Sequence, residues 1–165
     1  MATWQYDIQL IPKSSLLEVY QNIPSYLTFE DYDKKDWWDG KLLPSDFESR
    51  IEECLPIWNR SWSPSSKAWG WEQGDRIEIH YSEKKVDEIY IRIDVRNLNE
   101  TFLELVVCLA VLADCLIWAV ESNRLIKPNL YELLQEIHLS SAYKFVTNPE
   151  GFLNSIGNKL KSFLN

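Results

Sequence analysis

The chain has 165 residues, of which 45% are hydrophobic and 25% charged, and this composition is typical of a globular protein rather than a disordered one. We expect a single domain over residues 1–165, long enough to bury its core without a metal or a disulfide. A formal net charge of −8, with no run rich in Lys or Arg, argues against nucleic-acid binding, because phosphate recognition requires a basic surface.

The N-terminus and the cysteines indicate a cytoplasmic protein. Residues 1–7 lack the basic start and apolar run of a signal peptide, and the three cysteines form no CxxC pair that would predict disulfides or structural zinc. The apolar run 102–120 could span a membrane by composition, but it carries Glu104 and Asp114, and a carboxylate inside a spanning helix is costly. We therefore predict a buried helix there and no membrane association.

In chain order, residues 3–11 alternate apolar and polar side chains, which predicts a strand. Ser14 is a candidate cap for a short helix, and residues 28–43 have no clear period, which predicts a long acidic and aromatic loop. A helix is expected after residues 44–46, and the breaker-rich residues 58–66 predict a second loop.

The clearest β-signal lies at residues 76–95, where apolar side chains alternate with polar ones on both sides of a turn at 82–87. This pattern predicts an antiparallel hairpin with one apolar face. The apolar positions are Ile77, Ile79, Tyr81, Ile89, Ile91, Ile93 and Val95.

After residue 96 the chain is predicted to be all helical. A long helix over 101–122 would be capped by Asn99, and Pro128 and Pro149 would open two further helices. The predicted fold class is α+β, with a small antiparallel sheet, made from the N-terminal strand and the hairpin, covered by helices.

No catalytic motif is present. The chain has two histidines, His80 and His138, and it lacks a GxSxG elbow, an HExxH zinc motif and a glycine-rich phosphate loop. A Ser-His-Asp arrangement stays open, because such partners meet only in the folded chain. We predict no catalytic residue and no cofactor, and a non-enzymatic protein is the favoured interpretation.

Residues 30–53 hold nine acids and four bases. The aspartates of this stretch, among them Asp36 and Asp39, do not have the spacing of a calcium loop, so no metal site is predicted. The stretch is either a solvated acidic face or a surface that steers the protein toward a basic partner.

Six of the eight tryptophans lie between residues 37 and 71, at Trp37, Trp38, Trp58, Trp62, Trp69 and Trp71. Tryptophans in such loops either fill the core or anchor a protein interface. Because Trp37 and Trp38 are adjacent, we expect one of them to be exposed as an anchor, between Asp36 and Asp39.

An alternative site is a cleft lined by Trp69, Trp71, Asp94 and Arg96, which would bind a small molecule or serve an unrecognised enzyme. Asp94 and Arg96 lie on the polar side of the second hairpin strand. Asp114 would be buried in the long helix and would need a cationic partner, which Arg92 or Arg96 could supply if the helix packs across the hairpin.

Several short motifs resemble a family of small uncharacterised bacterial proteins. They are Trp37-Trp38-Asp39-Gly40, Trp69-Gly70-Trp71 with Gly74-Asp75, Arg92-Ile93-Asp94-Val95-Arg96, and Ser141-Ala142 with Phe145-Val146 and Asn148-Pro149. The order and size of the chain are also similar to immunity proteins of bacterial polymorphic toxin systems. The resemblance implies an acidic protein that neutralises a basic toxin, without a catalytic site.

The sequence therefore predicts a protein-binding domain of immunity or inhibitor type. Its binding surface would be the acidic, tryptophan-bearing loop, and its partner a basic protein. The small-molecule cleft and a homo-oligomeric structural subunit stay open as alternatives.

Overall fold

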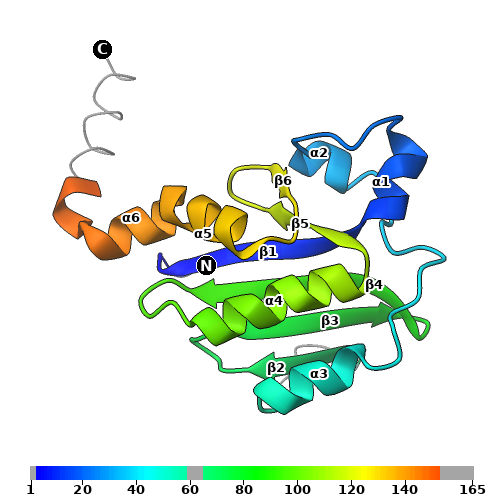
Figure 1. Cartoon of the computed structure of the whole chain (residues 1–165), viewed down its shortest axis with the longest axis horizontal. Coiled ribbons are helices and arrows are strands. Elements are labelled where there is room, and N and C mark those ends of the chain that lie inside the picture. Colours follow the sequence, from blue (N-terminus) through cyan, green and yellow to red (C-terminus); the bar gives the residue numbers. More distant parts are fainter. Residues whose placement is uncertain (1–2, 59–64, 153–165) are drawn as a thin grey trace.

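A computed structural model describes residues 3–58 and 65–152 as an antiparallel sheet with helices packed on it (Figure 1). The described elements are, in chain order, β1 (Gln5–Pro12), α1 (Lys13–Val19), α2 (Phe29–Tyr32), α3 (Phe47–Cys54), β2 (Ser66–Gly70), β3 (Arg76–Ser82), β4 (Lys85–Asp94), α4 (Glu100–Leu112), β5 (Cys115–Ala119), β6 (Arg124–Ile126), α5 (Leu130–Leu139) and α6 (Ser141–Thr147). The predicted α+β class is confirmed.

The sheet has the strand order β2-β3-β4-β1-β5-β6, and every neighbouring pair is antiparallel. The N-terminal strand β1 lies between β4 and β5, so it is buried along its whole length. One face of the sheet is apolar because strand side chains alternate with a period of two. Ile77, Ile91 and Ile8 stand side by side on this face and are fully buried.

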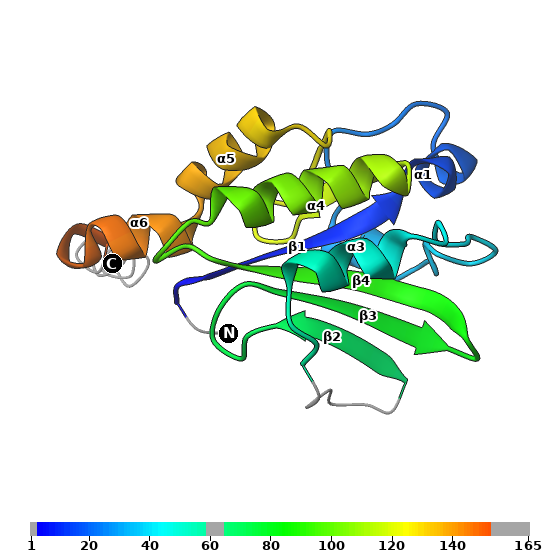
Figure 2. The same ribbon diagram turned by 60° about the horizontal axis from the view of Figure 1, so that its bottom comes forward.

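Helices α3, α4 and α5 cover the apolar face, as Figure 2 shows. Helix α4 begins where Asn99 was expected to cap it, and the Asn99 side chain accepts a hydrogen bond from the backbone N–H of Phe102 at 3.3 Å. Phe102, Val106 and Leu109 recur at helical spacing and are buried against the sheet. This packing makes the core.

Both edges of the sheet are covered by short segments of the same chain. Gly70 N–H donates to the carbonyl of Pro56 beside β2, and Leu125 N–H donates to the carbonyl of Ser25 beside β6, at 2.8 and 2.9 Å. Exposed strand edges tend to pair with other chains. These segments therefore reduce the backbone donors and acceptors available for edge-to-edge association.

The prediction that everything after residue 96 is helical is wrong. Helix α4 ends at Leu112, a turn at Ala113 and Asp114 follows, and the rest of the apolar run forms strand β5, after which the chain adds strand β6. Asp114 is exposed, and Arg92 and Arg96 pair with Asp7 and Asp94, so the expectation that Asp114 is buried and paired with one of these arginines is also wrong. A short apolar run is compatible with both a buried helix and a buried strand, and only the pairing of β5 with β1 decides between them.

The helix expected after Pro128 is α5, with Asn129 as its cap. The helix expected from Pro149 begins as predicted, since residues 149–152 are helical, but its continuation from residue 153 lies outside the described residues. Across residues 3–58 and 65–152, no helix has the length and apolarity needed to cross a bilayer.

Candidate functional site

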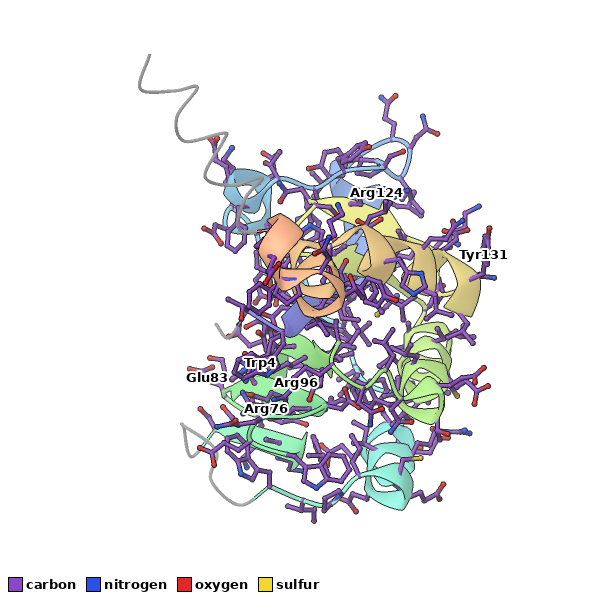
Figure 3. All side chains as sticks on the ribbon, turned by 90° about the vertical axis from the view of Figure 1, so that its left-hand side faces the viewer. Trp4, Arg76, Glu83, Arg96, Arg124 and Tyr131 are labelled. Carbon is purple, nitrogen blue, oxygen red and sulfur yellow. The ribbon has the colours of Figure 1, made fainter. Side chains whose placement is uncertain are left out.

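The face of the sheet opposite α3, α4 and α5 carries polar side chains, most of them ionisable, from three adjacent strands. We call this set the polar sheet face, and it consists of Asp7 and Gln9 on β1, Arg76, Glu78 and His80 on β3, and Glu88, Tyr90 and Arg92 on β4. The strand registers place them in cross-strand rows, and Figure 3 shows Arg76 on the side of the sheet away from α3 and α4. Alternation along each strand predicts which residues share this face, but not which of them meet.

Two guanidinium groups stand opposite one another on the polar sheet face. Arg76 and Arg92 are direct cross-strand partners, an arrangement that destabilises a sheet unless the charges are balanced. Glu78 Oε1 lies 2.5 Å from Arg76 Nη2, and Asp7 Oδ1 lies 3.6 Å from Arg92 Nε. Trp58 covers Arg76, with its ring centroid 4.4 Å from the guanidinium carbon. The row is therefore a balanced, largely buried ionic layer.

Residues 28–41 pack against the polar sheet face where β1 and β4 lie side by side. Tyr32 of α2 donates its hydroxyl to Glu88 Oε1 at 3.4 Å, and the Gln9 amide donates to the same oxygen. The Tyr32 ring stacks on Trp118 with centroids 4.4 Å apart. Burial raises the pKa of both Glu88 and Tyr32. The stretch predicted to be an irregular loop is thus attached to the sheet by aromatic and polar contacts.

A pocket of about 240 Å³, the acidic pocket, opens beside this attachment. It is lined by Tyr32, Asp33, Lys35, Asp36, Trp37, Asp87 and Glu88. Among the described residues, Asp33, Asp36 and Asp87 have no ion-pair partner, whereas the Nζ of Lys35 lies 3.1 Å from Glu18 Oε2. Four carboxylates and one ammonium group therefore line the pocket, which leaves an excess of negative charge.

The expectation of an exposed tryptophan anchor at 37–38 is wrong, because Trp37 and Trp38 are each 3% exposed. A turn lets the adjacent indoles enter different parts of the core. Trp37 Nε1 donates to the carbonyl of Tyr32 at 2.9 Å, and Trp38 Nε1 donates to the carbonyl of Leu10 at 3.1 Å. Asp36 and Asp39 stay exposed on either side, as the sequence suggested. The tryptophans fix the loop, and the acids face solvent.

The residues of the alternative cleft do not meet in one site. Trp69 is 1% exposed and lies opposite Ile77 on the helix-covered face, whereas Trp71 is 50% exposed in the turn after β2. Asp94 and Arg96 do come together, since Arg96 Nη2 donates to Asp94 Oδ2 at 2.6 Å. The Trp4 ring covers Arg96, on the same side of the sheet as Arg76 (Figure 3). A cleft shared by all four predicted residues is therefore not formed.

A Ser-His-Glu chain also lies on the sheet. His80 Nδ1 is 2.9 Å from Ser66 Oγ on the neighbouring strand, and His80 Nε2 is 3.6 Å from Glu78 Oε2. The other oxygen of Glu78 binds Arg76, so this carboxylate already balances a buried charge. We interpret the chain as part of the ionic layer. Within residues 3–58 and 65–152, no group of three or more His, Cys, Asp or Glu side chains could hold a metal.

Sequence reasoning missed Asp87 and Glu88 as partners of the acidic loop. Alternation in the hairpin placed Glu88 on the polar side of its strand, but the nearness of β4 to residues 32–37 follows from the β1–β4 pairing, which joins residues about 80 positions apart. A local pattern does not contain this contact.

Comparison with protein-family models, curated proteins and solved structures gives no match for this chain. The likeness of its short motifs to small bacterial proteins and to immunity proteins therefore stays a prediction.

Proposed function

We propose that this chain is a non-enzymatic, cytoplasmic protein-binding domain of immunity or inhibitor type, and that it docks on a basic partner through the acidic pocket. The observation that carries the proposal is the set of three carboxylates, Asp33, Asp36 and Asp87, which line one concavity without an ion-pair partner among the described residues. A lysine or arginine side chain of the partner would supply the missing positive charge.

The charge distribution supports association with a basic surface. The whole chain carries −8, and residues 30–53 contribute −5 of it. A concave site lined by charge of one sign focuses its field and raises the rate at which an oppositely charged partner arrives. Mutual repulsion of unpaired carboxylates is unfavourable in the free protein, so neutralisation by a cation relieves it.

The rigidity of the loop also favours binding. Trp37 and Trp38 are buried and hydrogen-bonded to backbone carbonyls, and Ser15 Oγ donates to the carbonyl of Trp37 at 2.5 Å. A surface that is already ordered loses little conformational entropy when a partner docks. The aromatic residues would thus serve binding indirectly, by holding the aspartates in place.

The proposal is tested by measuring how quickly a partner associates. A partner would first be captured from native lysate at low salt and purified, and its association rate constant measured against ionic strength. The triple variant Asp33→Asn/Asp36→Asn/Asp87→Asn should lower that rate constant by roughly tenfold or more at low salt and flatten its salt dependence.

A matched control separates the acidic pocket from total charge. Glu52→Gln/Glu53→Gln/Glu104→Gln removes the same number of charges from exposed positions on α3 and α4. The control should retain most of the wild-type rate. Equal effects of the two triple variants would show that net charge alone steers the association, and an unchanged rate in the pocket variant would refute the proposed docking site.

A further inference from the structure

A second cavity lies where the end of β1, the α4–β5 turn and the end of β6 meet. Its volume is about 450 Å³, within the range of roughly 300–1,000 Å³ common for small-molecule sites. Figures 1 and 2 both place the C-terminal end of α4 beside α1 at this end of the sheet. Lys13 lies near the start of the chain, whereas Ala110, Val111, Asp114, Cys115, Leu116, Leu125 and Lys127 belong to its second half.

The inner wall of this cavity is apolar. Ala110 of α4, Cys115 and Leu116 of β5 and Leu125 of β6 line it and are buried. Burial also raises the pKa of the Cys115 thiol well above its ordinary value, so the thiol stays neutral and behaves as an apolar group. Val111, 61% exposed, leaves an apolar surface at the rim.

Two exposed lysines contribute to the lining of the same cavity. Lys13 follows β1 and Lys127 follows β6, and both line it. Neither forms an ion pair within the described parts of the chain, where Lys34, Lys35, Lys41, Lys67, Arg50, Arg76, Arg92, Arg96 and Arg124 all do. Asp114 is the one carboxylate that lines the cavity, so its lining carries a net charge of +1.

We propose that this cavity binds a small organic acid that has an apolar body and one terminal carboxylate. The apolar wall would bury the body of the ligand, and Lys13 and Lys127 would bind the carboxylate at the rim through charge-assisted hydrogen bonds. The chain as a whole is acidic, with 25 acidic and 17 basic residues, so its net charge repels anions. At this apolar cavity the two unpaired lysines reverse the local charge and favour an anionic ligand. This site is independent of the acidic pocket.

Isothermal titration calorimetry with three probes of equal chain length tests the chemistry. Decanoate, decanol and decylammonium would each be titrated into the full-length protein below their micellar concentrations. We expect saturable binding with decanoate tightest, since only its head group complements the two lysines. Absence of saturable binding, equal affinity for decanoate and decanol, or a preference for decylammonium would overturn the proposal.

The variant Lys13→Gln/Lys127→Gln should weaken decanoate binding by roughly tenfold or more and leave decanol binding unchanged, because only the charged head group loses its partners. The pair Lys84→Gln/Lys85→Gln, exposed in the hairpin turn region, removes the same charge and should bind as wild type. Equal losses in both variants would assign the effect to net charge and refute the site. The acidic-pocket triple variant should bind decanoate normally, so this proposal and the proposed function can fail separately.

Discussion

Asp75 illustrates how a single side chain is constrained by its surroundings. It is 7% exposed, and its Oδ1 accepts the backbone N–H of Asp94 at 2.9 Å. Burial raises the pKa of Asp75 from 3.8 to about 6, and the nearby Asp94 carboxylate acts in the same direction. The hydrogen bond opposes this rise but does not cancel it.

This raised pKa predicts a dependence of stability on pH. The folded chain binds a proton at Asp75 more tightly than the unfolded chain, so the stabilisation from protonation is present below pH 4 and is lost as pH rises through 6. The loss amounts to about 3 kcal/mol at most. Asp75→Asn keeps the oxygen acceptor and does not titrate. Urea unfolding from pH 4 to pH 7 should therefore show wild type losing stability relative to Asp75→Asn, and parallel profiles would contradict this.

At the scale of elements, the connection from α4 to β5 decides the topology of the C-terminal half. Leu112 ends the helix, and Asp114 follows with a φ of 47°, in the left-handed region. Its N–H donates to the carbonyl of Val111 at 3.2 Å, which closes the last turn of the helix. The chain then reverses into β5, whose five residues are all buried. A residue in this conformation is a common helix terminator.

We expect Asp114→Gly to be more stable than Asp114→Ala by about 1 kcal/mol, because glycine adopts a positive φ without the steric cost that a Cβ imposes. Chemical denaturation of the two variants measures the difference directly. Both changes remove the same charge, so electrostatic effects cancel in the comparison. Equal stabilities would mean that the turn is not strained by a side chain at this position.

At the scale of the whole molecule, the sheet separates an apolar layer from an ionic one. The apolar face packs on α3, α4 and α5, whereas the opposite face holds the buried Asp7, Arg76 and Glu78 and the half-buried Arg92 as a balanced set of charges. Buried ion pairs add little net stability compared with apolar residues of similar size, but removing one partner is costly. The row therefore disfavours a shifted strand register, which would leave its charges without partners.

The charged row predicts non-additive effects of substitutions. Asp7→Leu alone leaves Arg92 facing Arg76 with one acid fewer, and should lower the free energy of unfolding by about 3 kcal/mol. The double variant Asp7→Leu/Arg92→Met removes the pair together and should be more stable than Asp7→Leu. Urea denaturation of both single variants and the double variant measures the coupling. A double-variant loss equal to the sum of the single losses would refute this ionic coupling.

Local patterns in the sequence were sufficient for the parts of this fold that local physics controls. Alternation predicted β1 and the β3–β4 hairpin, Asn99 predicted the start of α4 as its cap, and Pro128 predicted the start of α5. Side-chain period and helix caps depend on neighbouring residues, so a single sequence contains them. The acidic character of residues 30–53 was also visible at this level.

Tertiary structure alone decided the rest. Strand β5 forms because β1 and β6 supply its hydrogen bonds. Trp37 and Trp38 are both buried because a turn directs them into separate spaces. Asp87 lies beside the acidic loop because strand pairing brings β4 there. Lys13 and Lys127 likewise line one cavity although they lie in different halves of the chain. Each of these outcomes depends on contacts between residues far apart in sequence, and such contacts leave no local periodicity to read.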